Sequence, residues 1–288
     1  MCGSQSVYLI TTRKIYKCRE CKKQFSVKVG TIFEDSPIGL DKWLPVVWLI
    51  ANCKNGISSY EIARDIKVTQ KSAWFMLQRI REAMHSGTFD TKLFGQIEVD
   101  ETFIGGKARN MHSHKRAQKI TGTGGKDKIA VLGILERGSS IDGSKIRVKV
   151  IRDTRKKTLQ AEIRDHVLAG SAIFSDALRS YEGLDEFQHE VVDHAVEYVR
   201  GEVHTNGLEN FWSLLKRSLK GTYVSCEPFR LHRYIGEQAF RYNNRKHLND
   251  LERFTLVLGQ ATGRRLTYEH LTGKDKLLDR SNSQNPLA

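Results

Sequence analysis

The segment 96-QIEVDETFIGGK-107 is rich in branched and aromatic apolar residues, which predicts a buried β-strand. Three carboxylates, Glu98, Asp100 and Glu101, interrupt this strand. A charge that is buried without a partner is costly, and a divalent metal ion would compensate it. Because side chains alternate along a strand, Glu98 and Asp100 share one face and Glu101 lies on the other. We therefore predict that Asp100 is a metal ligand, and that Glu98 is either its neighbour in the site or a solvated edge residue.

The residues that follow predict an α/β domain. The expected elements, in order, are strands at 95–104, 128–138 and 145–153, an amphipathic helix over 154–170 that Gly170 closes, a short strand that stops at Asp176, a short strand near Val191 and a helix over 204–221. The second and third strands are expected to form a hairpin. Three strands, a helix, a strand and a helix is the order of an RNase H-like domain with a mixed sheet.

Three carboxylates are expected to meet in such a domain. Its first strand is central and the strand of Asp176 is a neighbour, so Asp100 and Asp176 can approach each other. At about 100° per residue, the last helix has an apolar side and an adjoining polar side that carries Asn206, Glu209 and Lys216. Cations held by shared carboxylates are the usual solution for phosphoryl transfer on nucleic acid. Alternatively, Asp176 caps a following helix.

Residues 56–84 predict a helix-turn-helix. Ser58 and Glu61 have the spacing of a capping box, and Thr69 can cap a second helix that runs to about Met84. The alternative is an ordinary pair of packed helices. Four polar residues of the second helix are expected to point outward, toward DNA: Gln70, Lys71, Gln78 and Arg79.

The cysteines suggest a metal site near the N-terminus. Cys18 and Cys21 form a C-x-x-C pair in a basic, aromatic setting, and Cys2 is the other cysteine nearby. The total of five cysteines is odd, which favours thiols or metal ligands over disulfides. Three ligands do not close a tetrahedral zinc site, so zinc binding and free thiols both stay open.

The charge balance points to a polyanionic partner. Lys and Arg number 47 against 33 Asp and Glu, for a formal net charge of +14. The alternative is a solvated basic surface. The best apolar run, Trp43–Cys53, is too short to span a bilayer and is expected to be a buried helix. Since no signal-peptide core is evident, we expect a cytoplasmic protein whose partner is nucleic acid.

Several long motifs together resemble one family. The segments IEVDETFIGGK, FSDALRSYEGL, HTNGLENFWSLLKRSLKGTY and FRLHRYIGEQAFRYNNR closely resemble the DDE transposases of bacterial insertion sequences, specifically the ISXO2-like group. The upstream YKCRECKKQFSVKVGTIFEDSPIGLDKWL and the helix-turn-helix are similar to that group's zinc ribbon and DNA-binding segment. The group's ribbon begins with a C-x-x-C, of which only Cys2 is present here.

The resemblance implies a catalytic site. It makes Asp100 the first catalytic carboxylate and Asp176 the second, holding two Mg²⁺ or Mn²⁺ ions. The third position is either Asn206 or Glu209, and we favour Glu209 because a carboxylate neutralises metal charge and an amide does not. Lys216 resembles the basic residue that follows the third ligand and contacts DNA phosphate. His204 is expected to touch the substrate or merely to start the helix.

The resemblance also implies partners and a domain order. The partners are double-stranded DNA, as terminal inverted repeats and as target, and a second copy of the chain on that DNA, with no membrane. Further phosphate contacts are expected from Lys107, Lys115, Arg116, Lys216, Arg217 and Lys220. The expected domains are a partial zinc ribbon at 1–35, the helix-turn-helix region at 36–90, an RNase H-like catalytic domain at 91–250 and a partly disordered tail at 251–288. The rival functions are a catalytically inactive relic that represses by binding DNA, and a structure-selective nuclease.

Overall fold

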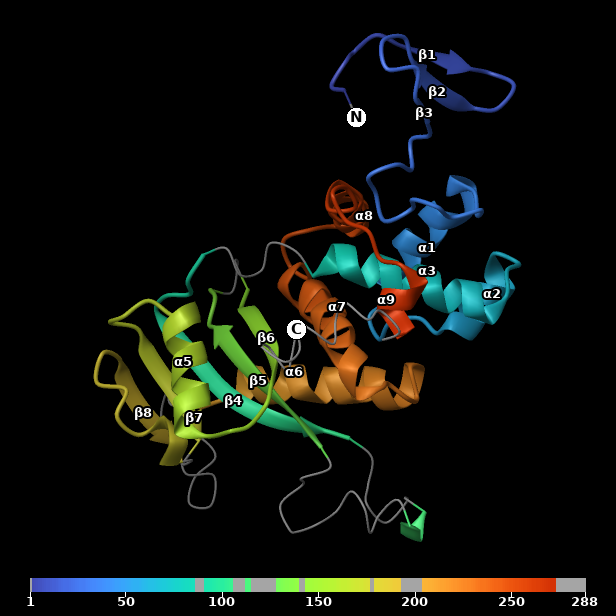
Figure 1. Cartoon of the computed structure of the whole chain (residues 1–288). Helices are drawn as coiled ribbons and strands as arrows, with labels where there is room; N and C mark the ends of the chain where they lie inside the picture. Colours follow the sequence, from blue (N-terminus) through green and yellow to red (C-terminus); the bar gives the residue numbers. More distant parts are fainter. Residues whose placement is uncertain are drawn as a thin grey trace.

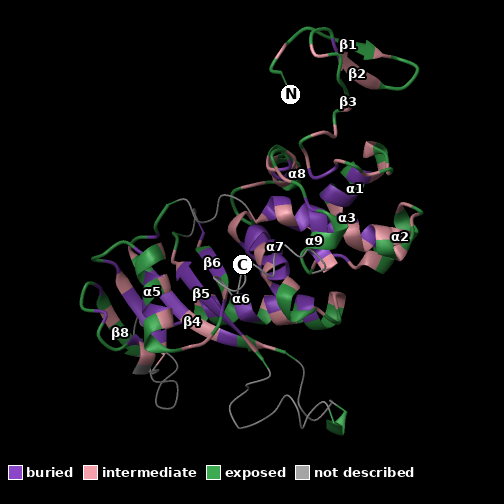
Figure 2. Cartoon of the chain, viewed as in Figure 1, coloured by how far each residue is buried: buried purple, intermediate pink, exposed green. Residues whose placement is uncertain are grey.

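The chain forms a small N-terminal β-ribbon, a group of helices and a sheet covered by helices (Figure 1). The computed structural model describes residues 2–85, 91–105, 112–114, 128–139, 143–176, 179–192 and 204–272. Figure 2 shows buried residues gathered in the helical group and in the sheet, and few in the ribbon.

The N-terminal ribbon is a three-stranded antiparallel sheet with almost no core. Its strands are β1 (Val7–Ile10), β2 (Ile15–Cys18) and β3 (Gln24–Phe25). Within residues 2–30, Cys18 alone is buried. A sheet this small buries too little apolar surface to be stable without a staple such as a metal ion or a disulfide.

The helical group is built around one long helix. The helices are α1 (Leu40–Asn52), α2 (Ser59–Asp65), α3 (Gln70–Met84), α8 (Asp250–Gly259) and α9 (Tyr268–Thr272), with the start of α7 (Leu231–Asn243) below them in Figure 1. The predicted capping box of Ser58 with Glu61 is confirmed, and the Thr69 side chain accepts a hydrogen bond from the Ser72 N–H. Lys67, at φ +51°, makes the tight turn between α2 and α3.

The end of the chain takes part in this helical core. Trp43, Val47 and Ile50 of α1 share one apolar cluster with Phe240 of α7 and Val257 of α8. The prediction that residues 251–288 form a tail is therefore wrong for α8, which covers α1. Residues 273–288 lie outside the described residues. The proposed domain boundaries stay a prediction.

The sheet has five strands in the order β6-β5-β4-β7-β8. They are β4 (Gln96–Ile104), β5 (Ile129–Glu136), β6 (Lys145–Ile151), β7 (Ala172–Asp176) and β8 (Gln188–Val192). The central strand β4 pairs antiparallel with β5 and parallel with β7, and β5 and β6 form the predicted hairpin. The predicted strands and their order are thus confirmed, and the sheet is mixed.

Helices cover both faces of this sheet. On one face, α5 (Lys156–His166) packs Leu159 and Ile163 on Ile97 and Val99 of β4. On the other, α6 (Asn206–Arg217) packs on β5, with α7 beside it. A π-helical turn, η3 (Ser218–Thr222), and a short 3₁₀ turn, η4 (Pro228–Arg230), connect α6 to α7. Another 3₁₀ turn, η2 (Arg179–Tyr181), follows β7.

Helix α5 ends earlier than the sequence predicts. It stops at His166, because the next residue, Val167, is extended and forms a parallel bridge with Leu93. Gly170 does not close the helix. At φ +86° it lies in the turn that leads into β7. The bridge to a residue more than 70 positions away overrides the local helical pattern.

One glycine allows α6 to lie close to the sheet. Gly133 of β5 pairs with Asp100, and a Cβ there would lie 2.7 Å from side-chain carbons of both Leu208 and Trp212. We expect Gly133→Ala to lower the free energy of unfolding by about 1–3 kcal/mol, because α6 would have to move outward. Urea denaturation of this variant measures the loss. The control Gly259→Ala, where a Cβ meets nothing within 4 Å, should show no loss.

No helix among the described residues is both long and apolar enough to cross a membrane.

Candidate functional site: carboxylates between the sheet and helix α6

Strands β4 and β7 place Asp100 and Asp176 side by side. The two strands are parallel, and Glu98 pairs with Phe174. Two residues further along the same register, Asp176 at the end of β7 comes level with Asp100. Residues at one level of neighbouring parallel strands project from the same face of the sheet. Here this is the face that α6 covers, since the Trp212 indole N–H donates a 2.8 Å hydrogen bond to Oδ2 of Asp100.

The beginning of α6 is fixed by Glu98. Its carboxylate is 1% exposed, so it is not a solvated edge residue. Oε2 accepts a 2.9 Å hydrogen bond from the Leu208 N–H in the first turn of α6, and Oε1 pairs with Arg137 at 2.8 Å. A carboxylate in this position satisfies a backbone N–H that has no partner within the helix. Its negative charge is also stabilised by the positive end of the helix dipole. The lack of a side chain at Gly207 makes room for it, because a Cβ would lie 2.8 Å from Oε2.

His204 belongs to the same contact. The Arg137 guanidinium donates to the His204 carbonyl oxygen and lies 2.8 Å from its ring Nδ1. The guanidinium also stacks 4.4 Å from the centroid of the Phe174 ring on β7. His204 lies just before Thr205, the N-cap residue of α6, and both roles expected for it stay predictions. Glu98 and Arg137 thereby join β4, β5, β7 and α6 in one polar contact near Asp100.

Burial and neighbouring negative charge alter the titration of Asp100. Burial raises its pKa, the Trp212 hydrogen bond opposes this, and Asp176 and Glu209 raise it further, to about 6. Glu209 lies in the first turn of α6 and is exposed, as is Asn206. Asp176 and Glu209 are thus near enough to Asp100 to act on it electrostatically, although the three carboxylates do not form a group of described residues whose oxygens lie within 4.8 Å of one another.

A fourth carboxylate, Glu101, lies on the opposite face of β4. It accepts a hydrogen bond from the hydroxyl of the fully buried Tyr181. Burial raises the pKa of Glu101 to about 7, and Asp176 and Asp100 add to the rise. The alternation of side chains along a strand predicts that Glu101 and Asp100 lie on opposite faces of the sheet. No local sequence pattern identifies Tyr181 as the partner of Glu101.

The basic residues expected to contact DNA fall into three sets. On α6 and η3, Lys216 is half-buried, while Arg217 and Lys220 are exposed. Lys107, Lys115 and Arg116 lie outside the described residues. On α3, Lys71 is exposed and lies 4.9 Å from the centroid of the Tyr268 ring, and Gln70 donates to the Ser59 hydroxyl.

The expectation that Gln78 and Arg79 point outward is wrong. Gln78 is 0% and Arg79 is 4% exposed. Gln78 donates to the Tyr234 hydroxyl, and Arg79 donates to the carbonyl oxygens of Glu34 and Leu266. Helix α3 is surrounded by other elements along most of its length, so only its first turns are open to a partner.

Sequence comparison identifies the family of this chain. The sequence model of the ISXO2-like transposase domain matches residues 92–243, which run from just before β4 to the end of α7. The chain belongs to the ISXO2-like transposase family. The matched segment includes Asp100, Asp176 and Glu209 together with the Glu98 contact that fixes α6.

Two relatives agree with this assignment. An "uncharacterized protein in transposable element ISH50" of Halobacterium salinarum is 29% identical and aligns over 76% of each chain. An "uncharacterized transposase-like protein" of Haemophilus influenzae is 34% identical over 103 residues, which are 35% of this chain and 82% of the relative. Both names refer to transposable elements or transposases.

In this family member, three cysteines of the ribbon come together. The ligand atoms of Cys2, Cys18 and Cys21 all lie within 4.8 Å of one another, and this is the one such group of three or more His, Cys, Asp or Glu residues in the part of the chain that is described. The Cys2 and Cys18 sulfurs are 3.5 Å apart, and all five cysteines are free. Backbone N–H groups of Cys21 and Glu20 outweigh burial and lower the pKa of Cys18 to about 7.

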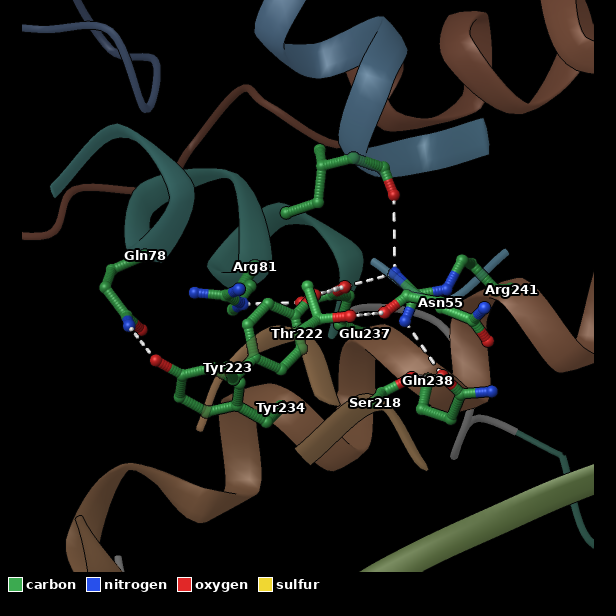
Figure 3. A network of polar contacts seen from close by, with 11 residues as sticks. Asn55, Gln78, Arg81, Ser218, Thr222, Tyr223, Tyr234, Glu237, Gln238 and Arg241 are labelled. Atoms are coloured by element: carbon green, nitrogen blue, oxygen red, sulfur yellow. Dashed lines mark hydrogen bonds and ion pairs between the residues drawn. The ribbon is translucent and has the colours of Figure 1, made fainter. Parts of the chain in front are cut away.

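The helical group meets α7 through a buried ionic cluster that sequence reasoning missed (Figure 3). Glu237 of α7 is 0% exposed and pairs with Arg81 of α3 at 2.6 Å and with Arg241 one turn further along α7. The Tyr223 hydroxyl donates to Glu237 as well. The i, i+4 spacing of Glu237 and Arg241 is visible in the sequence, but such pairs are usually solvated.

Proposed function

We propose that this chain is an insertion-sequence transposase that cleaves the ends of its own element and joins them to target DNA. The observation that carries this is the placement of Asp100 and Asp176 at one level of adjacent parallel strands, with Glu209 of α6 near enough to act on Asp100 electrostatically. The strand order also supports an RNase H-like core. The first strand of the sheet, β4, is central, with the antiparallel strands β5 and β6 on one side and the parallel strands β7 and β8 on the other.

The side chains present fit a pair of divalent cations. Carboxylate oxygens are the ligands that Mg²⁺ and Mn²⁺ prefer. Burial is the largest cause of the raised pKa of Asp100, and Asp176 and Glu209 add to it, so a cation bound there would favour the charged form of Asp100. Asp100, Asp176 and Glu209 would hold these ions, which when bound activate the nucleophile and stabilise the leaving oxygen in phosphoryl transfer.

The chain's own residues bind and orient around this site. Trp212 fixes one oxygen of Asp100, and Glu98 fixes the helix that carries Glu209. Lys216 lies on the polar side of the same helix and holds a DNA phosphate. Water attacks the phosphodiester at the element end and releases a 3′-hydroxyl. That hydroxyl then attacks a phosphodiester of the target, so the number of phosphodiester bonds is conserved in the second step.

Recognition of the element ends is assigned to α2 and α3 as a helix-turn-helix. A recognition helix contacts bases mainly through its N-terminal residues. The first turns of α3, with Gln70 and the exposed Lys71, suit this role. Two ends must be joined in one event, so we expect at least two copies of the chain on DNA.

The test is a cleavage and strand-transfer assay. It uses the purified full chain, Mg²⁺ and a labelled duplex from the terminal inverted repeat that flanks the gene, with a supercoiled plasmid as target. Wild type should nick the duplex end and join it to the plasmid, and Asp100→Ala should bind the duplex without cutting. Cleavage without joining would indicate a nuclease, and specific binding without cleavage by wild type would indicate a repressor.

The carboxylates predict how cation binding depends on pH. Folding raises the pKa of Asp100 to about 6 and that of Glu101 to about 7, so the folded state binds protons that the unfolded state releases. The stability these groups contribute is complete below about pH 4 and is lost as the pH rises through their folded pKa values. Mg²⁺ should therefore raise the Tm more at about pH 8 than at about pH 5.5.

Calorimetry of wild type and Asp100→Asn measures this effect. The variant lacks the charge of the first carboxylate, so its Tm should respond weakly to Mg²⁺ at both pH values. An equal response to Mg²⁺ in wild type and variant would place the cation elsewhere.

The ribbon is proposed to be a zinc site with three thiolate ligands from the chain. The ribbon has almost no hydrophobic core, so a bound metal ion would supply the stability that the core lacks. Purified protein should contain about one zinc per chain by atomic absorption, and Cys18→Ser should lose it. The control Cys53→Ser, whose thiol lies at the end of α1, should keep its zinc. Equal metal content in both variants would contradict the site.

A further inference from the structure

We propose that a cavity beside α3 receives one unstacked nucleobase of the bound DNA end. The inference rests on the proposed function and adds a binding site to it. The cavity has a volume of about 370 Å³ and lies between the first turns of α2 and α3 and the segment after η3. That volume is in the range of small-molecule pockets, which is roughly 300–1,000 Å³.

A buried guanidinium lies at the cavity with unused hydrogen-bonding capacity. Arg81 lines the cavity and is 1% exposed. Its Nε donates to Glu237, whereas its Nη2 has no hydrogen-bond partner. A buried donor without an acceptor is costly, and Nη2 is closed to solvent, so an acceptor that enters the cavity would reach it once the surrounding side chains move.

The charge of the cluster also favours an electron-rich ligand. Glu237 alone faces two buried arginines, Arg81 and Arg241, so these three groups together carry one net positive charge. A carbonyl oxygen placed at Nη2 of Arg81 would accept a charge-assisted hydrogen bond, which is stronger than a neutral one.

The walls of the cavity suit a flat ring. Trp74, Tyr223 and Tyr234 line it. Arg81 covers one face of each tyrosine ring, 4.8 and 4.1 Å from the centroids, and Arg230 lies 4.9 Å from the centroid of Trp74, so the base would stack on the other face of Trp74. Aromatic faces of this kind stack on unpaired bases without regard to sequence. A phosphate would lose its hydration against these walls and find one guanidinium already shared with Glu237. Guanine and thymine offer both the ring and a carbonyl on their major-groove edge.

The rim of the cavity carries backbone strain. Val224 has φ +60°, a conformation that is an outlier for a β-branched residue, and its side chain is 77% exposed. Strained residues persist where the surrounding structure holds them, and they cluster at ligand sites. Val224 also lines the cavity, so the strained residue lies at its opening.

The cavity lies where DNA is expected to pass. Gln70, at the start of the proposed recognition helix, lines one side, and Lys71 next to it is exposed. Ser225, on the other side, follows the exposed Lys220 by five residues. A duplex that contacts both α3 and the end of α6 would therefore run across the opening of the cavity.

The experiment is a cycle of protein and DNA changes on the end duplex. A set of duplexes carries a single abasic site at each position in turn, and binding to wild type and Trp74→Ala is measured by fluorescence anisotropy. On the intact duplex, Trp74→Ala should weaken binding by about tenfold. At one position, the abasic duplex should bind both proteins equally, because the ring that stacks on Trp74 is gone.

Two further variants make the result specific. Trp48→Ala truncates a tryptophan of α1 that is 39% exposed, contacts Phe254 and does not line the cavity, so it should bind every duplex as wild type does. Ser225→Trp obstructs the opening from an exposed position and should reproduce the pattern of Trp74→Ala. If Trp74→Ala misfolds, this variant gives the result alone.

The outcomes separate this inference from the proposed function. One outcome is that wild type binds and cleaves the end duplex while the loss of binding free energy from Trp74→Ala and the loss from the abasic site add at every position. In that case the nucleobase site is wrong and the transposase assignment stands. If wild type binds the end duplex no better than a shuffled duplex, the proposed recognition fails and the nucleobase site fails with it.

Discussion

Glu209→Gln is expected to reduce DNA cleavage and joining by more than about a hundredfold. Loss of a group that supports a metal ligand already costs about 10–100-fold in many enzymes, and loss of a ligand itself should cost more. Glutamine keeps the size of the side chain and removes its charge. Because Glu209 is exposed and points away from the apolar side of α6, the fold should be unaffected. Single-turnover cleavage of the end duplex measures the rate.

Asn206→Ala is the matched control on the same side of α6. It removes an exposed amide one turn earlier in the helix and should reduce cleavage by less than about tenfold. The reverse order, with a severe loss in Asn206→Ala and a mild one in Glu209→Gln, would make Asn206 the third ligand. Raising the Mn²⁺ concentration should partly restore Glu209→Gln if its defect is in cation affinity.

The largest expected loss of stability comes from Glu237→Ala. The substitution leaves Arg81 and Arg241 buried without their shared carboxylate. Removal of one partner from a buried ion pair costs about 3–5 kcal/mol, because the remaining charge is uncompensated. Since Arg81 lies on α3 and Glu237 on α7, the loss should affect the helical group and α7 together. Urea denaturation followed by circular dichroism measures it.

An exposed ion pair provides the comparison. Glu186→Ala breaks the ion pair between Glu186, which is 34% exposed, and Arg164, which is 46% exposed. This substitution should lower the free energy of unfolding by less than about 1 kcal/mol. Burial opposes ionisation of Glu237, but Arg241 and Arg81 lower its pKa to about 2. Its stabilising contribution is therefore present above about pH 4.5 and lost as the pH falls toward 2. A similar loss in both variants would mean that the buried cluster has no special role.

The strands and helices of the sheet region followed closely from local patterns. Alternation in β4 put Asp100 and Glu101 on opposite faces, and Trp212 and Tyr181 contact them from opposite sides of the sheet. The helical period of α6 separated an apolar side, where Leu208 and Phe211 are buried, from the polar side. These predictions held because the period of a strand or helix depends on backbone geometry alone.

Predictions about which polar side chains are exposed were less reliable. Gln78 and Arg79 lie on a helix of ordinary amphipathic pattern, yet they are buried against Tyr234 and Leu266. Those partners are more than 150 residues away in the chain, so no local window contains them. Glu98 likewise finds its partner outside any local window, because its contact with the Leu208 N–H joins β4 to α6 across 110 residues.

By itself, the sequence determined the order of the strands and helices around the sheet and the caps of α2 and α3, because each depends on short-range spacing and residue chemistry. The tertiary structure alone decided where α5 ends, which polar residues of α3 are buried, and how Arg81, Glu237 and Arg241 combine. These features depend on contacts between distant segments. The free energy of burying a charge or a polar group is set by the partners that folding brings to it.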